Sequence, residues 1–120
     1  MNQPTAQHPQ MNPKQVAQRY IALSNAVDYD AMADLFAADA DWIPISPIGA
    51  RRGRDAIRAG YLEQVKATNR PIVNDRYYAD GPTCVVEFEV DLGDRQRAAI
   101  VDIFTVNAAG EISRLAVYRR

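Results

Sequence analysis

The spacing of apolar residues divides the chain into a helical first half and a second half of strands. Asn12-Pro13 is typical of a helix start, with asparagine at the cap and proline at the first helical position. Apolar residues then recur at helical spacing on one stripe, at Val16, Tyr20, Leu23 and Val27. A second, short helix is predicted from Asp28 onward. A third is predicted over 53–68, where Ile57 and Tyr61 share the inner face.

Beyond Pro71 the pattern changes to the period of two that is typical of β-strands. These runs, separated by turn residues, cover 72–79, 83–92, 95–106 and 111–119. An earlier strand, within 38–49, is interrupted by Pro44 and Pro47. Helices followed by an antiparallel meander predict the α+β class. We expect three N-terminal helices packed on a curved antiparallel sheet that encloses an apolar pocket.

Length and charge narrow the functional classes. The 120 residues suit one domain, which we place at 12–120 after a flexible tail of residues 1–11. With 14 basic and 15 acidic residues the net charge is −1, so we expect neither nucleic acid nor a membrane as a partner. Residues 1–10 lack the features of a signal peptide and no apolar stretch reaches membrane-spanning length, so a cytoplasmic location is expected.

The rare residue types exclude several kinds of site. Cys84 is the only cysteine, so an internal disulfide is impossible. His8 is the only histidine and lies in the polar, proline-containing lead. Imidazole is the usual base of Ser/His and Cys/His dyads and a usual ligand of transition metals. We therefore expect no such dyad and no metal site.

An apolar strand over residues 98–106 carries one acid, Asp102, in its middle. A carboxylate there has to be paired, turned to the surface, or held neutral with a raised pKa. By periodicity Tyr20, Tyr61 and Asp102 all point to the interior. Two phenols and one neutral acid in an apolar cavity would form hydrogen-bond donors that stabilise an oxyanion on a carbonyl substrate. The alternative is a satisfied core network, with a tyrosine hydroxyl bonded to the Asp102 carboxylate.

The chain from Val16 to Tyr118 resembles the bacterial steroid Δ5-3-ketoisomerases, within the larger group of NTF2-like and SnoaL-like cone-shaped domains. The strongest segments are QRY at 18–20, LFAADA at 35–40, PIG at 47–49, RRGRDAIRAGY at 51–61 and DIFTVNAAGEI at 102–112. The resemblance implies that Tyr20 and Asp102 form an oxyanion hole and that Tyr61 supports Tyr20. It also implies that Asp102 keeps its proton and donates to a carbonyl that becomes an enolate.

One part of the family pattern is missing. The isomerases have a general base, an aspartate just before the Pro-x-Gly after the first strand, and that position falls on Ser46, or on Pro44 without a gap. Neither residue can act as that base at neutral pH. The rate of proton abstraction therefore loses a contribution of about 10²- to 10⁴-fold. The candidate replacement bases are Asp41, Glu87 and Glu89.

The register of the hairpin around residue 93 decides where the two glutamates lie. With Asp91 and Glu89 opposite Arg95 and Arg97, both glutamates lie on the outer face. We favour this register because it places the intervening phenylalanine and valine in the core. A turn shifted by one residue would bring both glutamates into the pocket beside Asp102.

The predicted pocket and the predicted contact between subunits lie on opposite faces of the sheet. Residues expected to line the pocket are Phe36, Trp42, Ser46, Phe88, Leu115 and Tyr118. The outer face carries Val101, Ile103 and Thr105. An apolar outer surface of this kind predicts a homodimer, which the resemblance also implies.

The leading hypothesis is a ketosteroid isomerase-like enzyme that binds an apolar carbonyl compound, steroid- or polyketide-like. It would stabilise the enolate during double-bond isomerisation or a related aldol or polyketide cyclisation. All the donors are side chains, so no cofactor is implied. A non-catalytic binding domain for an apolar small molecule is the alternative. Epoxide hydrolysis is a third hypothesis, because the chain is also similar to the limonene-epoxide hydrolase branch of this group. That branch relies on an Asp-Arg-Asp set, for which Arg97 or Arg114 would supply the arginine here.

Overall fold

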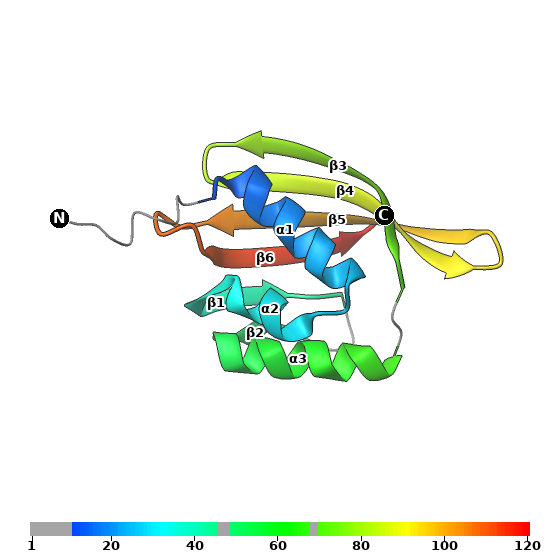
Figure 1. Ribbon diagram of the computed structural model, residues 1–120, viewed down its shortest axis with the longest axis horizontal. Helices are drawn as coiled ribbons and strands as arrows, with labels where there is room; N and C mark the ends of the chain where they lie inside the picture. The colour runs from blue at the N-terminus through cyan, green and yellow to red at the C-terminus, as the bar shows by residue number, and fades with distance from the viewer. Residues whose placement is uncertain (1–10, 46–48, 68–69) are drawn as a thin grey trace.

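The structure, a computed structural model, describes residues 11–45, 49–67 and 70–120. Within them, the helices are α1 (Pro13–Asn25), α2 (Tyr29–Asp34) and α3 (Arg54–Ala67). The strands are β1 (Phe36–Ile43), β2 (Arg51–Arg52), β3 (Ile72–Asp80), β4 (Thr83–Gly93), β5 (Gln96–Val106) and β6 (Ile112–Arg119). The helices lie on one face of the sheet, with α1 crossing the central strands (Figure 1). The predicted α+β class is confirmed, and all but one residue of the predicted tail lie outside the described residues.

The strands form one open sheet in the order β2-β1-β6-β5-β4-β3. From β3 to β6 consecutive strands pair antiparallel, as the meander predicted. The expectation of an entirely antiparallel sheet is wrong at one place, because β1 pairs parallel with β6. Parallel neighbours need a long crossover connection, and here the chain from β2 to β5 provides it. The early strand and the last strand therefore lie side by side in the sheet (Figure 1).

Capping contacts confirm the predicted helix starts. The side chain of Asn12 accepts a hydrogen bond from the Gln15 backbone N–H at 2.9 Å, and the Gln15 side chain accepts one from the Asn12 N–H at 2.9 Å. Asp28 accepts a hydrogen bond from the Ala31 N–H at 3.2 Å and begins α2. These caps fix the residues at which α1 and α2 begin.

The β4–β5 hairpin turns at residues 94–95, both with positive φ, as in a two-residue type I′ turn. Asp91 therefore stands opposite Arg97, two residues from the pairing predicted around a turn at Gly93. A shift of two residues leaves every side chain on its face. Phe88 is accordingly buried and Glu89 lies on the outer face, so the favoured face assignment is confirmed.

The core lies between the helices and the inner face of the sheet. Its buried aromatic residues are Tyr20, Phe36, Trp42, Tyr61, Phe88 and Phe104. They come from both helices and strands, so the packing of these rings sets how α1 and α3 sit on the sheet. The candidate functional groups lie inside this aromatic core.

Candidate functional site

Three elements bring Tyr20, Tyr61 and Asp102 into the core. Tyr20 comes from α1, Tyr61 from α3 and Asp102 from β5, and each is less than a tenth exposed. The two tyrosine hydroxyl oxygens lie 2.5 Å apart and share a hydrogen bond. All three side chains thus point inward, in the direction that the periodicity of their elements predicted.

Asp102 is the one buried charged residue in the described part of the chain, with 3% of its surface exposed. Val86 of β4 and Val117 of β6 flank it across the sheet, and its Oδ1 has no hydrogen-bond partner. Burial raises the pKa of Asp102 to about 8. At neutral pH the carboxyl group is therefore mostly protonated and carries an O–H that can donate. A satisfied core network does not account for the free oxygen.

The tyrosine pair keeps its protons as well. Burial raises the pKa of both Tyr20 and Tyr61 well above the usual value of 10. Their mutual hydrogen bond uses one of the two hydroxyl protons, so one proton is left to donate. After burial, the charge of an ionised Asp102 is the next cause of the raised pKa of Tyr20. Tyr20 and Asp102 are therefore two neutral donors in one apolar interior.

Aromatic rings surround the hydroxyl pair. Phe104 meets Tyr20 edge-on with ring centroids 5.1 Å apart, and Phe36 does so at 6.3 Å. On the other side, the ring of Trp42 lies 4.5 Å from that of Tyr61. Rings packed this closely keep water away from the hydroxyls, and a hydrogen bond is electrostatically stronger in such a surrounding than in water.

Three residues of this cluster were not predicted from the sequence. Phe104 lies two residues beyond the buried acid on the same strand face, so the period of two could have found it. Tyr29 stacks on Tyr61 with centroids 6.0 Å apart, and no pattern at the start of a short helix indicates this. Gly60 leaves room for an indole, because a Cβ there would lie 2.3 Å from Cζ3 of Trp42.

Most of the predicted pocket residues lie in the core. Those found buried on the inner side are Phe36, Trp42, Phe88 and Leu115. The prediction for Tyr118 is wrong, because it is 50% exposed and pairs with Val101 on the outer face. It lies three positions from inward-facing Leu115, and a period of two puts residues at that spacing on opposite faces. Ser46 lies outside the described residues.

The three candidate replacement bases lie on the outer face of the sheet. Glu87 stands opposite Val101 of β5, which is next to the inward-facing Asp102 and therefore faces the outer side of the sheet. Glu89 accepts a hydrogen bond from Asn74 at 2.6 Å, which lowers the pKa of Glu89. Asp41, 44% exposed at its side chain, lies 3.5 Å from the guanidinium of Arg52. Because alternate strand positions face opposite sides, none of these carboxylates reaches the interior, and their assignment as bases is corrected.

The arginines considered for an Asp-Arg-Asp set also lie outside. Arg97 forms an ion pair with Glu89 at 3.3 Å on the outer face. Arg114 is exposed and stands opposite Thr105 on that same face. The described residues therefore bring no arginine of this pair to Asp102.

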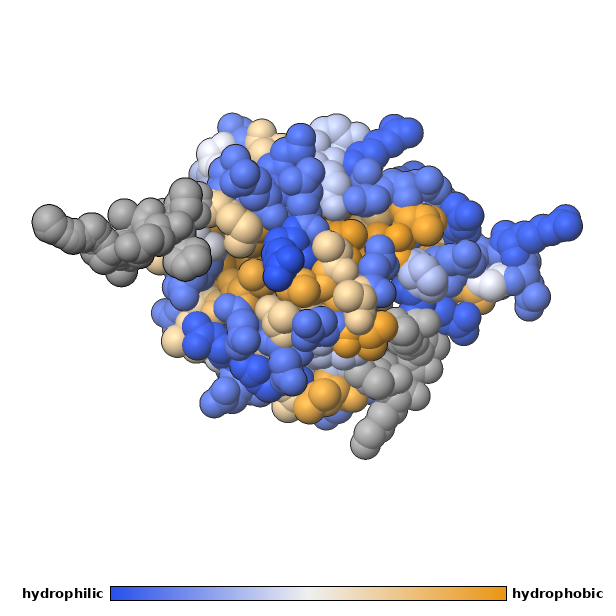
Figure 2. Space-filling model, in the orientation of Figure 1, coloured by the Kyte–Doolittle hydropathy of each residue, from blue (hydrophilic) through white to orange (hydrophobic). Residues whose placement is uncertain are grey.

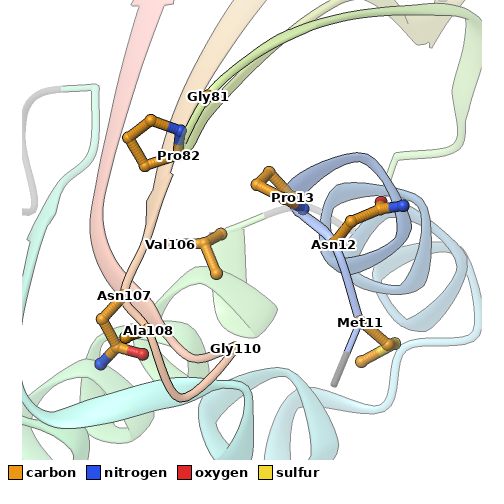
Figure 3. Close-up of a pocket in the computed structure, with 9 residues that line it drawn as sticks. All are labelled: Met11, Asn12, Pro13, Gly81, Pro82, Val106, Asn107, Ala108 and Gly110. Carbon is orange, nitrogen blue, oxygen red and sulfur yellow. The ribbon is translucent and has the colours of Figure 1, made fainter. Parts of the chain in front are cut away.

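A crevice of about 400 Å³ opens beside the start of α1, between the β3–β4 turn and the end of β5 (Figure 3). Of the described residues, its lining includes Pro13, Pro82, Val106 and Asn107, and none that is charged. Val106 lies four residues beyond Asp102 along β5, which corresponds to about 13 Å. This crevice is thus separate from Tyr20, Tyr61 and Asp102, which we call the donor set. An apolar pocket around Asp102 stays a prediction.

The described ranges offer neither a metal centre nor an exposed cysteine thiol. No group of three or more His, Cys, Asp or Glu residues there is placed to hold a metal ion. Cys84 is buried in β4, and burial raises the pKa of its thiol. In the same ranges, no helix combines the length and the apolar character that crossing a bilayer requires.

Comparisons with known proteins relate this geometry to a family. The SnoaL-like domain model matches residues 17–115. A solved protein from Sphaerobacter thermophilus is 28% identical, with a TM-score of 0.78, over 92% of this chain and 97% of that one. SalBIII, described as an epoxide hydrolase/cyclase-like enzyme in pyran ring formation in polyether salinomycin, is 26% identical, with a TM-score of 0.72, over 90% of each chain.

A candidate ketosteroid isomerase from Kribbella flavida is 24% identical, with a TM-score of 0.75, over 90% of this chain and 77% of that one. At this identity the likeness shows the fold alone. A search among curated proteins gives no significant match. The NTF2-like fold with a curved, open sheet, expected from the resemblance, is confirmed. Because the SnoaL-like family model matches residues 17–115, most of the chain, the protein belongs to the SnoaL-like domain family.

Proposed function

We propose that the protein binds an apolar carbonyl compound whose oxygen is held between the Tyr20 hydroxyl and the protonated Asp102. The observation that carries this proposal is the buried, unpartnered Oδ1 of Asp102, in the core that also holds the linked tyrosine hydroxyls. A buried polar atom without a partner costs about 1–3 kcal/mol. A ligand oxygen within hydrogen-bond distance of Asp102 would remove that cost.

The chemistry follows from where charge develops in the ligand. When a proton leaves the carbon next to a carbonyl, negative charge moves to the oxygen and an enolate forms. Fixed, neutral donors stabilise that charge without reorganising, and one such donor contributes about 10²- to 10³-fold in rate. Tyr61 is a positioning residue, because its hydroxyl holds that of Tyr20. The reaction class is double-bond isomerisation or a related aldol or polyketide cyclisation, and stabilisation by side chains uses no cofactor.

The proton has to leave the substrate without a second interior carboxylate among the described residues. Asp102 is the one buried charged group there, and its raised pKa keeps it protonated at neutral pH. It can therefore donate a hydrogen bond, but it cannot accept the proton of the substrate. We therefore expect any steroid isomerisation to run about 10²- to 10⁴-fold below that of an enzyme with a placed base. A cyclisation in which a group of the substrate takes the proton does not have this deficit.

A second candidate is acid-catalysed opening of an epoxide with ring closure. The supporting observation is again Asp102, because a buried acid with a pKa of about 8 can donate a proton to an epoxide oxygen at neutral pH. The similarity to SalBIII at 26% identity points to the same chemistry. Hydrolysis through an Asp-Arg-Asp set has less support, since Arg97 and Arg114 lie on the outer face.

The proposal is tested by following the isomerisation of 5-androstene-3,17-dione spectrophotometrically while titrating the fluorescence of Trp42, the only tryptophan. We expect saturable binding with slow turnover, and the same values for Glu87→Gln, a control on the outer face. Binding without turnover would favour a binding domain or a cyclase. The proposal is wrong if neither this steroid nor a phenolic enolate mimic binds.

Pairing of two copies through the outer face of the sheet stays a prediction. Val101 and Ile103 are only partly buried there, and Tyr118 is 50% exposed. We expect light scattering at micromolar concentration to give twice the chain mass of 13.4 kDa. Val101→Asp should then give the monomer mass, because it places a charge in the contact, and a wild-type monomer at all concentrations would contradict the prediction.

Apolar surface on the helical side offers a route to the site. Figure 2 shows apolar residues between the polar exposed faces of the helices and at the base of the β4–β5 hairpin. At that base Val90 and Leu92 are partly buried against the core, and Ile100 is 7% exposed. Because Ile100 and Asp102 share one face of β5, an apolar ligand lying along this surface would reach the acid.

A further inference from the structure

The indole N–H of Trp42 is a buried donor that the proposed function leaves unused. Trp42 is 1% exposed, and its Nε1 has no hydrogen-bond partner. An indole nitrogen donates only, and buried tryptophans usually find an acceptor. No residue in the described part of the protein supplies one, so this N–H is available to a bound molecule.

The indole ring is held in one orientation. Trp42 lies in β1 between Arg51 of β2 and Leu115 of β6. Its ring occupies the space where α3 would carry a side chain at Gly60, because a Cβ there would lie 2.3 Å from Cζ3 and 3.2 Å from Cη2. The ring of Tyr61 packs against it at 4.5 Å. A ring enclosed in this way does not turn its N–H out to solvent.

The indole also belongs to the same cluster as the proposed oxyanion donors. Tyr61, whose ring contacts Trp42, holds the hydroxyl of Tyr20. In the described part of the chain the two buried side-chain polar atoms without partners are Nε1 of Trp42 and Oδ1 of Asp102, and both residues lie in one core. A ligand that brings a carbonyl oxygen to Asp102 therefore enters a core that contains a second, free donor.

We propose that Trp42 donates a hydrogen bond to a second oxygen of the ligand, distinct from the carbonyl oxygen held by Tyr20 and Asp102. This inference rests on the proposed function and narrows its substrate class to apolar carbonyl compounds that carry a further hydroxyl, ketone or ether oxygen. A single neutral N–H suits a neutral acceptor, since it does not offset the burial of a full negative charge. Trp42 is thus a specificity-determining residue that discriminates against ligands with one oxygen.

The test uses the indole N–H itself as the probe. Because the chain has one tryptophan, ¹⁵N-labelled protein gives one indole N–H signal. The ligands are matched pairs that differ in the second oxygen: equilenin with 17-deoxyequilenin, and 2,6- or 2,7-dihydroxynaphthalene with 2-naphthol. We expect the signal to move downfield and to exchange more slowly with a two-oxygen ligand but not with its one-oxygen counterpart.

The test is completed by measuring the affinity of the Trp42→Phe variant for each ligand of the matched pairs. Phenylalanine keeps an aromatic ring at this position but has no N–H. We expect a loss of about 10-fold for the two-oxygen ligand and less than about 2-fold for its counterpart. Equal losses for both members of each pair, or an indole signal that is the same with all ligands, would overturn the inference and leave the proposed function standing. If the wild type binds none of these phenols, the proposed function fails, and this inference fails with it.

Discussion

Asp102→Asn is expected to be more stable than the wild type above pH 8, by on the order of 5 kcal/mol, and about equally stable near pH 4. The reason is the difference between the ordinary pKa of 3.8 and the value of about 8 that Asp102 has in the folded protein. Above pH 8 the wild type has to bury a carboxylate without a partner. Asparagine has nearly the same shape and does not ionise.

The sign follows from proton binding. Between about pH 4 and pH 8 the folded protein holds a proton that the unfolded chain has released, so raising the pH favours unfolding. One such group lowers the free energy of unfolding by about 1.4 kcal/mol per pH unit in this range. The stabilising contribution of the protonated form is complete below pH 4 and is lost as the pH rises through 8.

Urea denaturation followed by circular dichroism from pH 4 to pH 9 measures this difference. Subtracting the two curves removes the titration of all other groups. Glu89→Gln is the matched control, because Glu89 lies on the outer face and its pKa is lowered where that of Asp102 is raised, so its ionisation does not cause a loss of stability as the pH rises. A wild-type curve parallel to that of Asp102→Asn would show that Asp102 ionises as it does in the unfolded chain, and would remove the neutral donor from the proposed function.

Tyr20→Phe is expected to weaken the binding of equilenin, as an enolate mimic, about 100-fold. Its cost to the free energy of unfolding is expected to be only about 1–2 kcal/mol, from the hydrogen bond lost by Tyr61. The two effects differ because, in the proposed site, the hydroxyl donates to the ligand, whereas the ring of Tyr20 makes the aromatic contacts, which phenylalanine keeps. Fluorescence titration and urea denaturation of the same preparations measure both.

Tyr61→Phe separates positioning from donation. This variant keeps the Tyr20 hydroxyl but removes the group that orients it, so we expect a loss of about 5- to 10-fold in equilenin affinity. In the double variant the second substitution should add little, because the two hydroxyls act as one unit. If Tyr20→Phe lowers affinity no more than Tyr61→Phe does, the hydroxyl pair is a structural contact and Tyr20 does not hold the oxyanion.

Much of the fold and the donor set could be predicted because both depend on local periodicity. The stripe of α1 turns Tyr20 inward, and the alternation along β5 turns Asp102 inward. The hairpin faces were predictable for the same reason, even though the turn lies two residues from its predicted place. Tyr118 shows the limit of the prediction, because it was placed in the pocket together with Leu115 although strand alternation puts residues three positions apart on opposite faces.

What the sequence left open depends on contacts between distant segments. The hydroxyl bond joins residues 41 apart, and only the family resemblance, not the pattern of either helix, indicated that Tyr61 supports Tyr20. The parallel pairing of β1 with β6 and the place that Gly60 leaves for Trp42 also arise only from tertiary packing. The free indole N–H of Trp42 and the unpartnered Oδ1 of Asp102 likewise follow only from the arrangement of all these elements.

The donor set is assembled from α1, α3 and β5, and this division has a practical consequence for finding the natural ligand. An unfolded chain holds these three side chains far apart, so a ligand that needs all of them binds the folded state only. By mass action, such a ligand at 100 times its dissociation constant stabilises the fold by about 2.7 kcal/mol. For a domain of this size that corresponds to a rise in melting temperature of roughly 10 °C. Compounds can therefore be ranked by melting alone, before the reaction they undergo is known.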